Sequence, residues 1–451
     1  MEQQRVYIKT FGCQMNERDT DVMLQLLAPM GYVSASSPEE ADLVLLNTCA
    51  VRAKAEQKVY SLLGQLRRLK ESRPGLLLGV SGCVAQLEGA RLFDRADYLN
   101  LVLGPRQLYR LPMLLHRLRA GESRRELALD VAEQPGQVFP VALPSPVHGA
   151  NPVTHRRYIT IMQGCDNFCS YCVVPTTRGR EVSRPVAEVL REVEVAVDHG
   201  AREITLLGQN VNSYGLKNSV AEPGYDFPAL LRRVAGVPGL KRLRFTTSHP
   251  KDLGDDLMRC FAELEVLCPH LHLPVQSGSD AVLARMNRGY GREVYLAKVA
   301  RLRQYRPDIV LGTDIIVGFP GESDENFQAT MALVEEVRFH NAFSFKYSDR
   351  VKTASIDFGD KIDEPVKAGR LAALQALQDR ITLECNQQFE GNIIQVMLEQ
   401  SSENETMRGR APGNQLVHFP LPSTMAPLHP GDIVDVHINR GGQHALVGEM
   451  V

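Results

Sequence analysis

Strand-like and helix-like hydrophobic patterns alternate along the first part of the chain. The apolar runs at Arg5–Phe11, Asp42–Asn47 and Leu76–Val80 have the length and composition of β-strands. Between them, Asn16–Met30 and the residues from about 50 to 70 have apolar positions at helical spacing. Strands that alternate with helices form βαβ units and a parallel sheet. We therefore expect an N-terminal α/β domain with a parallel sheet over residues 4–125.

The same alternation continues more fully over residues 151–380. Helical patterns such as Pro185–His199 and Ala281–Asn287 separate about six strands. Six such units suit a partial barrel rather than a closed barrel of eight, with a site at the carboxyl ends of the strands. The expected strands are Tyr158–Met162, Glu203–Leu207, Arg242–Thr246, His270–Val275, Ile309–Val317 and Ala342–Tyr347.

The end of the chain has a different pattern. Five prolines lie between Pro135 and Pro152 with almost no charge, which indicates a semi-extended linker over residues 126–150. From about Gly391 the helical periodicity stops and short alternating stretches appear. We expect residues 381–449 to form a five-stranded β-barrel of the kind that often binds RNA, the alternative being a barrel that only packs on the core. Its expected strands are Ile393–Leu398, Leu416–Phe419, Ile433–Ile438 and Ala445–Val447.

The composition limits the class of protein. Of 451 residues, 44% are hydrophobic and 23% are charged, which excludes a disordered or collagen-like chain. No apolar run reaches about 18 residues, and the first residues lack the apolar core of a signal peptide, so we expect a cytoplasmic protein without a membrane span. The net charge of −2 gives no overall attraction to nucleic acid. Nine cysteines, an odd number, favour metal ligands or redox groups over a disulfide framework.

Three cysteines occupy equivalent positions in the N-terminal domain. Cys13, Cys49 and Cys83 each come just after an expected strand. The carboxyl ends of parallel strands meet along one edge, where open α/β sheets carry their sites. We therefore expect the three thiols to converge, although three unrelated buried cysteines would also fit the sequence.

Three further cysteines follow the first strand of the central domain. Cys165, Cys169 and Cys172 form a C-x3-C-x2-C pattern on one loop. A structural zinc site normally has four ligands, and no fourth cysteine or histidine is near in the sequence. Iron–sulfur clusters are held by thiolates, and three thiolates leave one iron of a 4Fe–4S cluster open to a substrate. This loop therefore favours an iron–sulfur cluster over zinc.

The C-x3-C-x2-C pattern is the signature of radical S-adenosylmethionine enzymes, and the chain resembles the methylthiotransferases among them. The resemblance runs over nearly the whole chain and includes a C-terminal TRAM-like RNA-binding domain. Around the first three cysteines, in Thr10–Asn16, Asn47–Arg52 and Gly82–Gln86, it is closest to the branch that acts on isopentenyladenosine in tRNA. The other motifs that carry it are Gln163–Pro175, Thr177–Glu181, Leu207–Gly215, His272–Ser279 and Gly318–Glu322.

This resemblance implies a reaction that uses two 4Fe–4S clusters and two S-adenosylmethionine molecules. Cys165, Cys169 and Cys172 would hold the cluster that cleaves S-adenosylmethionine to a 5′-deoxyadenosyl radical, which abstracts hydrogen from the substrate. The other three cysteines would hold the auxiliary cluster, which delivers a methylthio group. The implied substrate is N6-dimethylallyladenosine at position 37 of tRNA, and the implied product carries a methylthio group at C2 of this base.

Partners and alternative substrates follow from the same resemblance. The implied partners are a tRNA anticodon stem-loop and an electron donor such as flavodoxin or ferredoxin, with the chain working as a monomer. The same chemistry on threonylcarbamoyladenosine in tRNA or on a ribosomal-protein side chain is an alternative. A zinc-stabilised RNA-binding protein without catalysis is the alternative from another class.

Six further residues are candidates for contacts with ligands. Tyr171, Gln209, Ser248 and Glu322 are candidates for S-adenosylmethionine, although Tyr171 would also suit core packing and Glu322 would also suit a helix cap. Arg178 and Arg180 are candidates for tRNA phosphates, with a structural ion pair as the alternative. Two positions depart from the family pattern, Thr176 beside the cluster loop and residues 348–353 after the sixth strand of the central domain.

Overall fold

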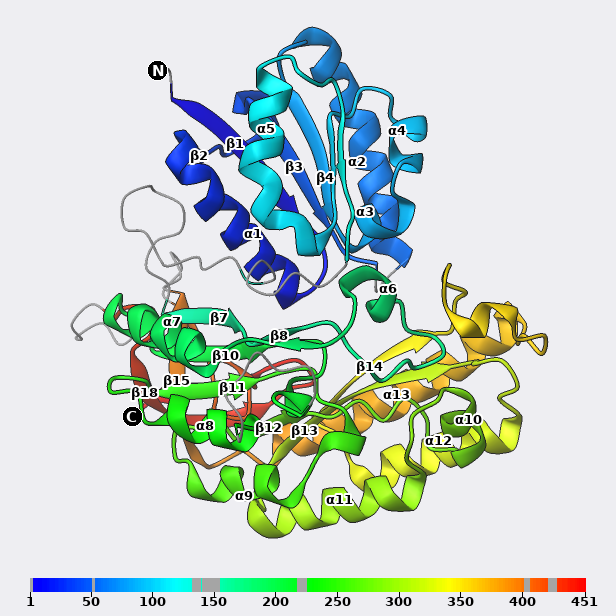
Figure 1. The fold of residues 1–451 in the computed structure, drawn as a ribbon. Coiled ribbons are helices and arrows are strands. Elements are labelled where there is room, and N and C mark those ends of the chain that lie inside the picture. The colour runs from blue at the N-terminus through cyan, green and yellow to red at the C-terminus, as the bar shows by residue number, and fades with distance from the viewer. Residues whose placement is uncertain are drawn as a thin grey trace.

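The computed structural model contains three units (Figure 1): an α/β unit in blue and cyan, a central unit in green and yellow, and C-terminal strands in orange and red. It describes residues 3–50, 53–131, 139, 155–216, 225–400, 406–420 and 428–451. The N-terminal unit lies on the side of the central unit that carries α6 (Val174–Arg178), which packs against α3 (Cys83–Glu88). The predicted fold class, α/β with a small all-β barrel at the end, is confirmed.

The N-terminal unit is a sheet of six parallel strands in the order β2-β1-β3-β4-β5-β6. Along the central strand β3, Leu43 and Leu45 belong to the core on one face, and Val44 and Leu46 to the core on the other. A parallel sheet covered by helices on both faces gives such a continuous apolar strand. The three strands that the pattern missed, β2, β5 and β6, have only three residues each, too few to show a period.

The elements of this unit have the following bounds. Its strands are β1 (Gln4–Thr10), β2 (Tyr32–Ser34), β3 (Leu43–Thr48), β4 (Leu77–Gly82), β5 (Leu101–Leu103) and β6 (Glu126–Ala128). Its α-helices are α1 (Gln14–Leu27), α2 (Ala53–Ser72), α3, α4 (Arg91–Arg95) and α5 (Leu111–Arg119). Because β6 belongs to this sheet, the first residues of the predicted linker are part of the domain, and most of the remaining linker lies outside the described residues.

The central unit holds six parallel strands in two groups of three, β7-β10-β11 and β12-β13-β14. A bridge between Leu243 and Leu267 connects β11 to the segment just before β12. Strands β7 and β14 remain as edges, so the described strands form the expected partial barrel. The predicted strand Tyr158–Met162 is divided, because β7 ends at Thr160 and the chain then turns into β8, which pairs antiparallel with β9.

The elements of the central unit have the following bounds. Its strands are β7 (Arg156–Thr160), β8 (Met162–Gln163), β9 (Val182–Ser183), β10 (Glu203–Leu207), β11 (Arg242–Phe245), β12 (His270–His272), β13 (Val310–Val317) and β14 (Asn341–Lys346). Its α-helices are α6, α7 (Val186–Asp198), α8 (Phe227–Ala235), α9 (Asp255–Glu263), α10 (Asp280–Arg285), α11 (Arg292–Tyr305), α12 (Asp324–Val337) and α13 (Glu364–Gln387).

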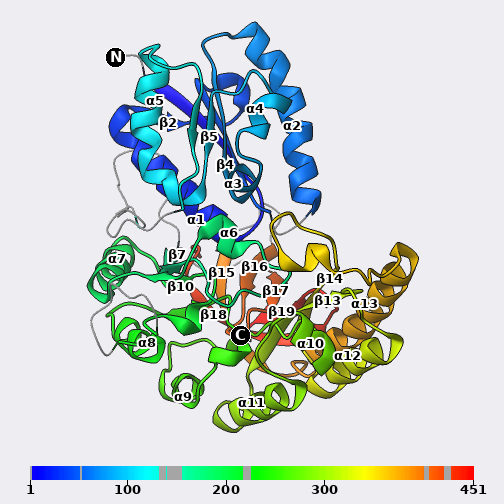
Figure 2. The same ribbon diagram turned by 45° about the vertical axis from the view of Figure 1, so that its right-hand side comes forward.

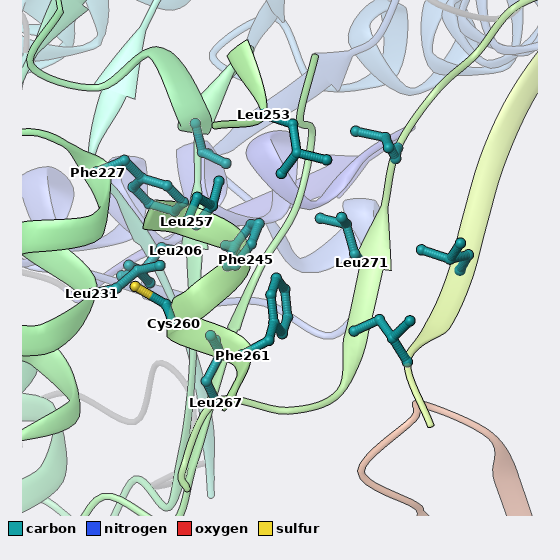
Figure 3. Close-up of a cluster of buried hydrophobic side chains, with 14 of the residues drawn as sticks. Leu206, Phe227, Leu231, Phe245, Leu253, Leu257, Cys260, Phe261, Leu267 and Leu271 are labelled. Atoms are coloured by element: carbon teal, nitrogen blue, oxygen red, sulfur yellow. The ribbon is translucent and has the colours of Figure 1, made fainter. Parts of the chain in front are cut away.

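Leucine and phenylalanine side chains pack together in the core between the strands and the helices of this unit (Figure 3). The ring of Phe245 lies 5.0 Å from that of Phe227 and 5.7 Å from that of Phe261, centroid to centroid. The thiol of Cys260 lies in the same apolar cluster. Cys260 therefore contributes to packing, and Cys268 and Cys385 are buried as well.

The C-terminal unit is the expected five-stranded barrel, closed in the order β15-β16-β17-β19-β18. It packs on the central unit through Arg242, which donates to the carbonyl oxygens of Gln395 and Arg410. The predicted domain start at residue 381 falls inside α13, which continues to Gln387. The strands are β15 (Ile393–Gln400), β16 (Thr406–Arg410), β17 (Leu416–Pro420), β18 (Ile433–Gly441) and β19 (Leu446–Met450). No helix within the described ranges is long and apolar enough to cross a membrane.

Candidate active site between two groups of cysteines

Cys13, Cys49 and Cys83 lie together at the carboxyl edge of the N-terminal sheet. Cys13 is the N-cap of α1, Cys49 directly follows β3, and Cys83 is the first residue of α3. A hydrogen bond links the thiols of Cys13 and Cys49, and the charge of Cys13 acts on Cys83. Gly12, with φ of +112°, makes this approach possible, because a Cβ there would overlap the Cβ of Cys49. The structure thus brings the three thiols together, as their positions after strands predict.

Different electrostatic effects act on these thiols. The pKa of Cys13 is lowered to about 6, mainly by the hydrogen bond with Cys49 and also by the positive charge of Arg178, although burial acts in the opposite direction. Burial raises the pKa of Cys83, and Arg178 opposes that rise. A nearby cation favours the thiolate form that binds metals. Arg178 therefore makes this group of cysteines a better thiolate site.

Cys165, Cys169 and Cys172 lie on the loop between β8 and α6. Gly164 allows the chain to turn into this loop, because its φ is +81° and a Cβ there would overlap the carbonyl of Arg180. Burial raises the pKa of Cys165 to about 11 and that of Cys172 to about 12. A negative charge on the neighbouring Cys169 also raises the pKa of both thiols. Three neighbouring half-buried thiolates would repel one another, so a bound group of positive ions is what would stabilise them.

Three cysteines on one loop provide the thiolate ligands that an iron–sulfur cluster needs. Among the described residues, no three histidine, cysteine or carboxylate side chains are close enough together to hold one metal ion. In a 4Fe–4S cluster with one open iron, three thiolates bind the other three irons. Three thiols on one loop therefore fit such a cluster.

Arg178 connects the two groups of cysteines. It follows the second group in sequence, at the end of α6, and its Nη2 donates to Oδ2 of Asp19 at 2.6 Å and to Oδ1 of Asn16 at 3.3 Å. Only 3% of its side chain and 5% of that of Asp19 are exposed. Arg178 was a candidate for contact with tRNA phosphates, but the structure places it in a buried ion pair, which was the alternative expectation. Arg180 is exposed over 57% of its side chain and pairs with Asp166 at 2.7 Å.

A second buried ion-pair network joins the same two units. Nη2 of Arg18 on α1 lies 2.5 Å from Oε1 of Glu192 on α7. Arg184 pairs with the other oxygen of Glu192. Arg106 donates to the carbonyl oxygen of Arg180. These contacts hold the sheet edge that carries Cys13 against the loop that follows Cys172. In both views of the ribbon, α1 lies at the junction between the N-terminal unit and the central unit (Figures 1 and 2).

The candidates for S-adenosylmethionine have different environments. Gln209 accepts a hydrogen bond of 2.5 Å from the backbone N–H of Gly164 and so supports the loop itself. The hydroxyl of Ser248 is buried and has no hydrogen-bond partner within the described part of the chain, so it is available to a ligand. Tyr171 is half-buried, and its hydroxyl lies 3.4 Å from Nη1 of Arg288.

Glu322 is buried and already has partners. Its Oε2 accepts from the backbone N–H of Gly318 at 2.6 Å and from Nη1 of Arg370 at 2.8 Å. It does not cap the following helix, because Ser323 is the N-cap of α12 and accepts from the N–H of Asn326. Of its two oxygens, Oε1 has no partner among the described residues.

Both departures from the family pattern are near the second group of cysteines: Thr176 follows these cysteines in the chain, and the segment 348–353 leads to their loop. Thr176 is half-buried on the short helix α6. In the segment 348–353, Asp349 accepts from the hydroxyl of Tyr347 at 2.8 Å and pairs with Lys361. Just beyond it, the N–H of Ser355 donates to the carbonyl oxygen of Ser170 at 2.8 Å, so this segment leads directly onto the cluster loop.

A polar and aromatic group that the sequence pattern did not single out lies inside the partial barrel. Nε2 of His272 on β12 lies 3.1 Å from Oδ1 of Asp314 on β13. The ring of Phe343 on β14 lies edge-on to that of His272 at 6.4 Å and is 49% exposed. The signal in the sequence is the spacing of polar residues within apolar strands, which marks the inner face of a barrel.

A cleft of about 610 Å³ reaches Phe343 from the outside. All three units contribute to its lining, with Gln14 from α1, Arg156 and Tyr158 from β7, and Arg410 from the C-terminal barrel. Gln14 directly follows Cys13 in the chain. The cleft therefore connects the neighbourhood of the first group of cysteines with the inside of the partial barrel.

Comparison with known proteins identifies the family. Residues 5–104 match the model of the Uncharacterized protein family UPF0004, and residues 159–334 match the Radical SAM superfamily. The chain is 49% identical over its full length to the tRNA-2-methylthio-N(6)-dimethylallyladenosine synthase of Desulfotalea psychrophila, all of which is covered. It is 48% identical to the enzyme of that name from Geobacter sulfurreducens, with 100% of this chain and 98% of the relative covered.

The chain belongs to this synthase family. It is a radical S-adenosylmethionine enzyme, and membership implies S-adenosylmethionine and a 4Fe–4S cluster. Among solved structures it is similar in fold to the radical S-adenosylmethionine methyltransferase TsrM from Kitasatospora setae, with a TM-score of 0.60, 16% identity and coverage of 79% of this chain and 74% of that chain. It is also similar to the cobalamin-dependent radical enzyme OxsB, with a TM-score of 0.54, 11% identity and coverage of 84% and 56%.

Proposed function

We propose that the protein adds a methylthio group to C2 of N6-dimethylallyladenosine at position 37 of tRNA. The observation that carries this proposal is the pair of three-cysteine groups, which Arg178 and Asp19 join through a buried ion pair of 2.6 Å. A reaction that needs a radical and a sulfur donor at one carbon requires two such centres near each other. The relatives that bear the name of this activity are 45–49% identical to the chain.

Each group of cysteines has its own part in this proposal. Cys165, Cys169 and Cys172 hold one 4Fe–4S cluster, and Cys13, Cys49 and Cys83 hold a second. When bound, the first cluster supplies the electron that cleaves S-adenosylmethionine and the second supplies the sulfur that is transferred. Gln209 fixes the loop of the first group through Gly164. The hydroxyl of Ser248 is free to bind S-adenosylmethionine.

In this proposal the substrate binds in the cleft that the three units share. Arg156 and Arg410, which both pair with Glu399, line it as the cationic groups nearest to a phosphate backbone, and Phe343 offers a ring on which a base can stack. In this proposal residues 381–449 and the cleft bind the anticodon stem-loop, residues 151–380 carry the radical chemistry and residues 4–125 carry the second cluster. The protein works as a monomer in the cytoplasm and takes electrons from a carrier such as flavodoxin or ferredoxin.

The test is an anaerobic assay of reconstituted protein with S-adenosylmethionine, a reductant and tRNA that carries dimethylallyladenosine. Mass spectrometry of the nucleosides should show the methylthio product with this tRNA. It should show none with matched tRNA that carries unmodified adenosine or threonylcarbamoyladenosine at the same position. If 5′-deoxyadenosine forms without the methylthio nucleoside, the proposed radical chemistry is supported and the proposed substrate is wrong.

The non-enzyme alternative predicts a different preparation. A zinc-stabilised RNA-binding protein would be colourless and would contain zinc even after strictly anaerobic handling. Iron–sulfur clusters would give a brown solution that bleaches on reduction. The relatives do not favour the alternative.

A further inference from the structure

Arg288 is a buried arginine in contact with the cysteine group of the radical chemistry. It lies three residues beyond the end of α10 and is 4% exposed. Its Nη1 lies 3.4 Å from Sγ of Cys169 and 3.4 Å from the hydroxyl of Tyr171. Its other nitrogens donate to the carbonyl oxygen of Pro274 at 2.7 Å and to the hydroxyl of Tyr290 at 3.0 Å. The guanidinium is therefore fixed from several sides with one edge toward a cysteine sulfur.

The partners of Arg288 leave its charge without a carboxylate. Among the other buried arginines, Arg178, Arg184, Arg244 and Arg370 each form an ion pair with an aspartate or a glutamate, whereas Arg242 donates to carbonyl oxygens of the C-terminal barrel. Within the described ranges, Arg288 has no such ion pair, and its oxygen partners are two hydroxyls and a carbonyl. A buried charge is costly unless an opposite charge is near. Burial raises the pKa of its tyrosine partners, Tyr171 and Tyr290, so their hydroxyls stay neutral. The partner of Arg288 that carries negative charge as a cluster ligand is the sulfur of Cys169.

We propose that Arg288 is a positioning residue that donates an N–H to Cys169 and serves as the counter-charge of the 4Fe–4S cluster at Cys165, Cys169 and Cys172. This inference rests on the proposed function, because it requires that cluster. A cluster with three thiolate ligands is an anion, and it gains one more negative charge when it accepts one electron from the reductant. A fixed cation at Cys169 stabilises the reduced form more than the oxidised form. Arg288 therefore raises the reduction potential of this cluster.

The test uses a background with one cluster. In the Cys13→Ala/Cys49→Ala/Cys83→Ala parent, an anaerobic redox titration followed by electron paramagnetic resonance reports the midpoint potential of the remaining cluster. Arg288→Gln should lower the ratio of reduced to oxidised cluster at a fixed potential at least tenfold, which is about 59 mV for one electron. Arg288→Lys keeps the charge and should stay within about threefold of the parent. Arg301→Gln, which removes an exposed arginine paired with Asp255, should leave the ratio unchanged.

Two results would overturn the proposal. One is an Arg288→Gln protein with an intact cluster whose ratio lies within threefold of the parent. The other is an Arg288→Lys protein whose ratio has fallen tenfold or more, and this second variant decides the matter if Arg288→Gln does not retain its cluster. A parent without any cluster would instead refute the assignment of ligands in the proposed function, so the two failures are distinguishable.

Discussion

The buried ion pair between Arg178 and Asp19 gives a quantitative prediction about how the two cysteine groups are held together. Both side chains are almost fully buried, at 3% and 5% exposure, and they belong to different units. Asp19→Leu leaves the guanidinium of Arg178 buried without its carboxylate. Removing one partner of a buried pair costs about 3–5 kcal/mol, whereas replacing both partners with apolar side chains is often neutral. We therefore expect a large loss of stability for Asp19→Leu and little loss for Asp19→Leu/Arg178→Met.

The assay is urea unfolding of the reduced, cluster-free protein under anaerobic conditions, followed by circular dichroism. With a slope of about 3 kcal/mol per molar urea, a loss of 3–5 kcal/mol lowers the midpoint by about 1 M or more. The control is Glu71→Ala, which breaks an exposed pair with Arg67 and should cost no more than about 0.5 kcal/mol. The reasoning is refuted if Asp19→Leu shifts the midpoint no further than Glu71→Ala, or if the double variant is as unstable as the single one.

Three further predictions concern the two clusters and the ligands. A Cβ at Gly12 would overlap Cys49, and a Cβ at Gly164 would overlap the carbonyl of Arg180. Each alanine variant should therefore lose one cluster, so that its iron content falls by about four of eight irons. The control Gly64→Ala should keep both clusters, because nothing lies within 4 Å of a Cβ there. Ser248→Ala should weaken S-adenosylmethionine binding about 2- to 12-fold by isothermal titration without loss of iron, since one hydrogen bond is removed; unchanged affinity would contradict its role. Phe343→Ala should raise the KM for tRNA about 5- to 150-fold and leave 5′-deoxyadenosine formation without tRNA unchanged; loss of both would indicate a structural role.

The sequence predicts the two cysteine groups because the position of each cysteine depends on nearby residues in the chain. Cys13, Cys49 and Cys83 follow strands, and parallel strands bring such positions to one edge. The other group is contiguous on one loop. The short strands β2, β5 and β6 have too few residues to show a pattern and form because neighbouring strands offer them hydrogen bonds.

The contacts that give the cysteines their environment could not be predicted in this way. Arg178 and Asp19 are 159 positions apart in sequence, and Arg288 and Cys169 are 119 apart. Each pair forms only when separate units or distant loops pack together, and a solvated arginine in a loop has the same local sequence as a buried one. The sequence therefore indicates the chemistry of the site, and only the fold shows which charges support it.

The most direct test of the account is to separate the two cysteine groups in one assay. The Cys13→Ala/Cys49→Ala/Cys83→Ala variant is reconstituted anaerobically and given S-adenosylmethionine, a reductant and tRNA with dimethylallyladenosine, and both 5′-deoxyadenosine and the methylthio nucleoside are measured. We predict that 5′-deoxyadenosine still forms and that the methylthio nucleoside is absent, whereas Cys165→Ala/Cys169→Ala/Cys172→Ala abolishes both. A folded first variant that makes no 5′-deoxyadenosine, or one that still makes the methylthio nucleoside, would contradict the proposed division between the two groups.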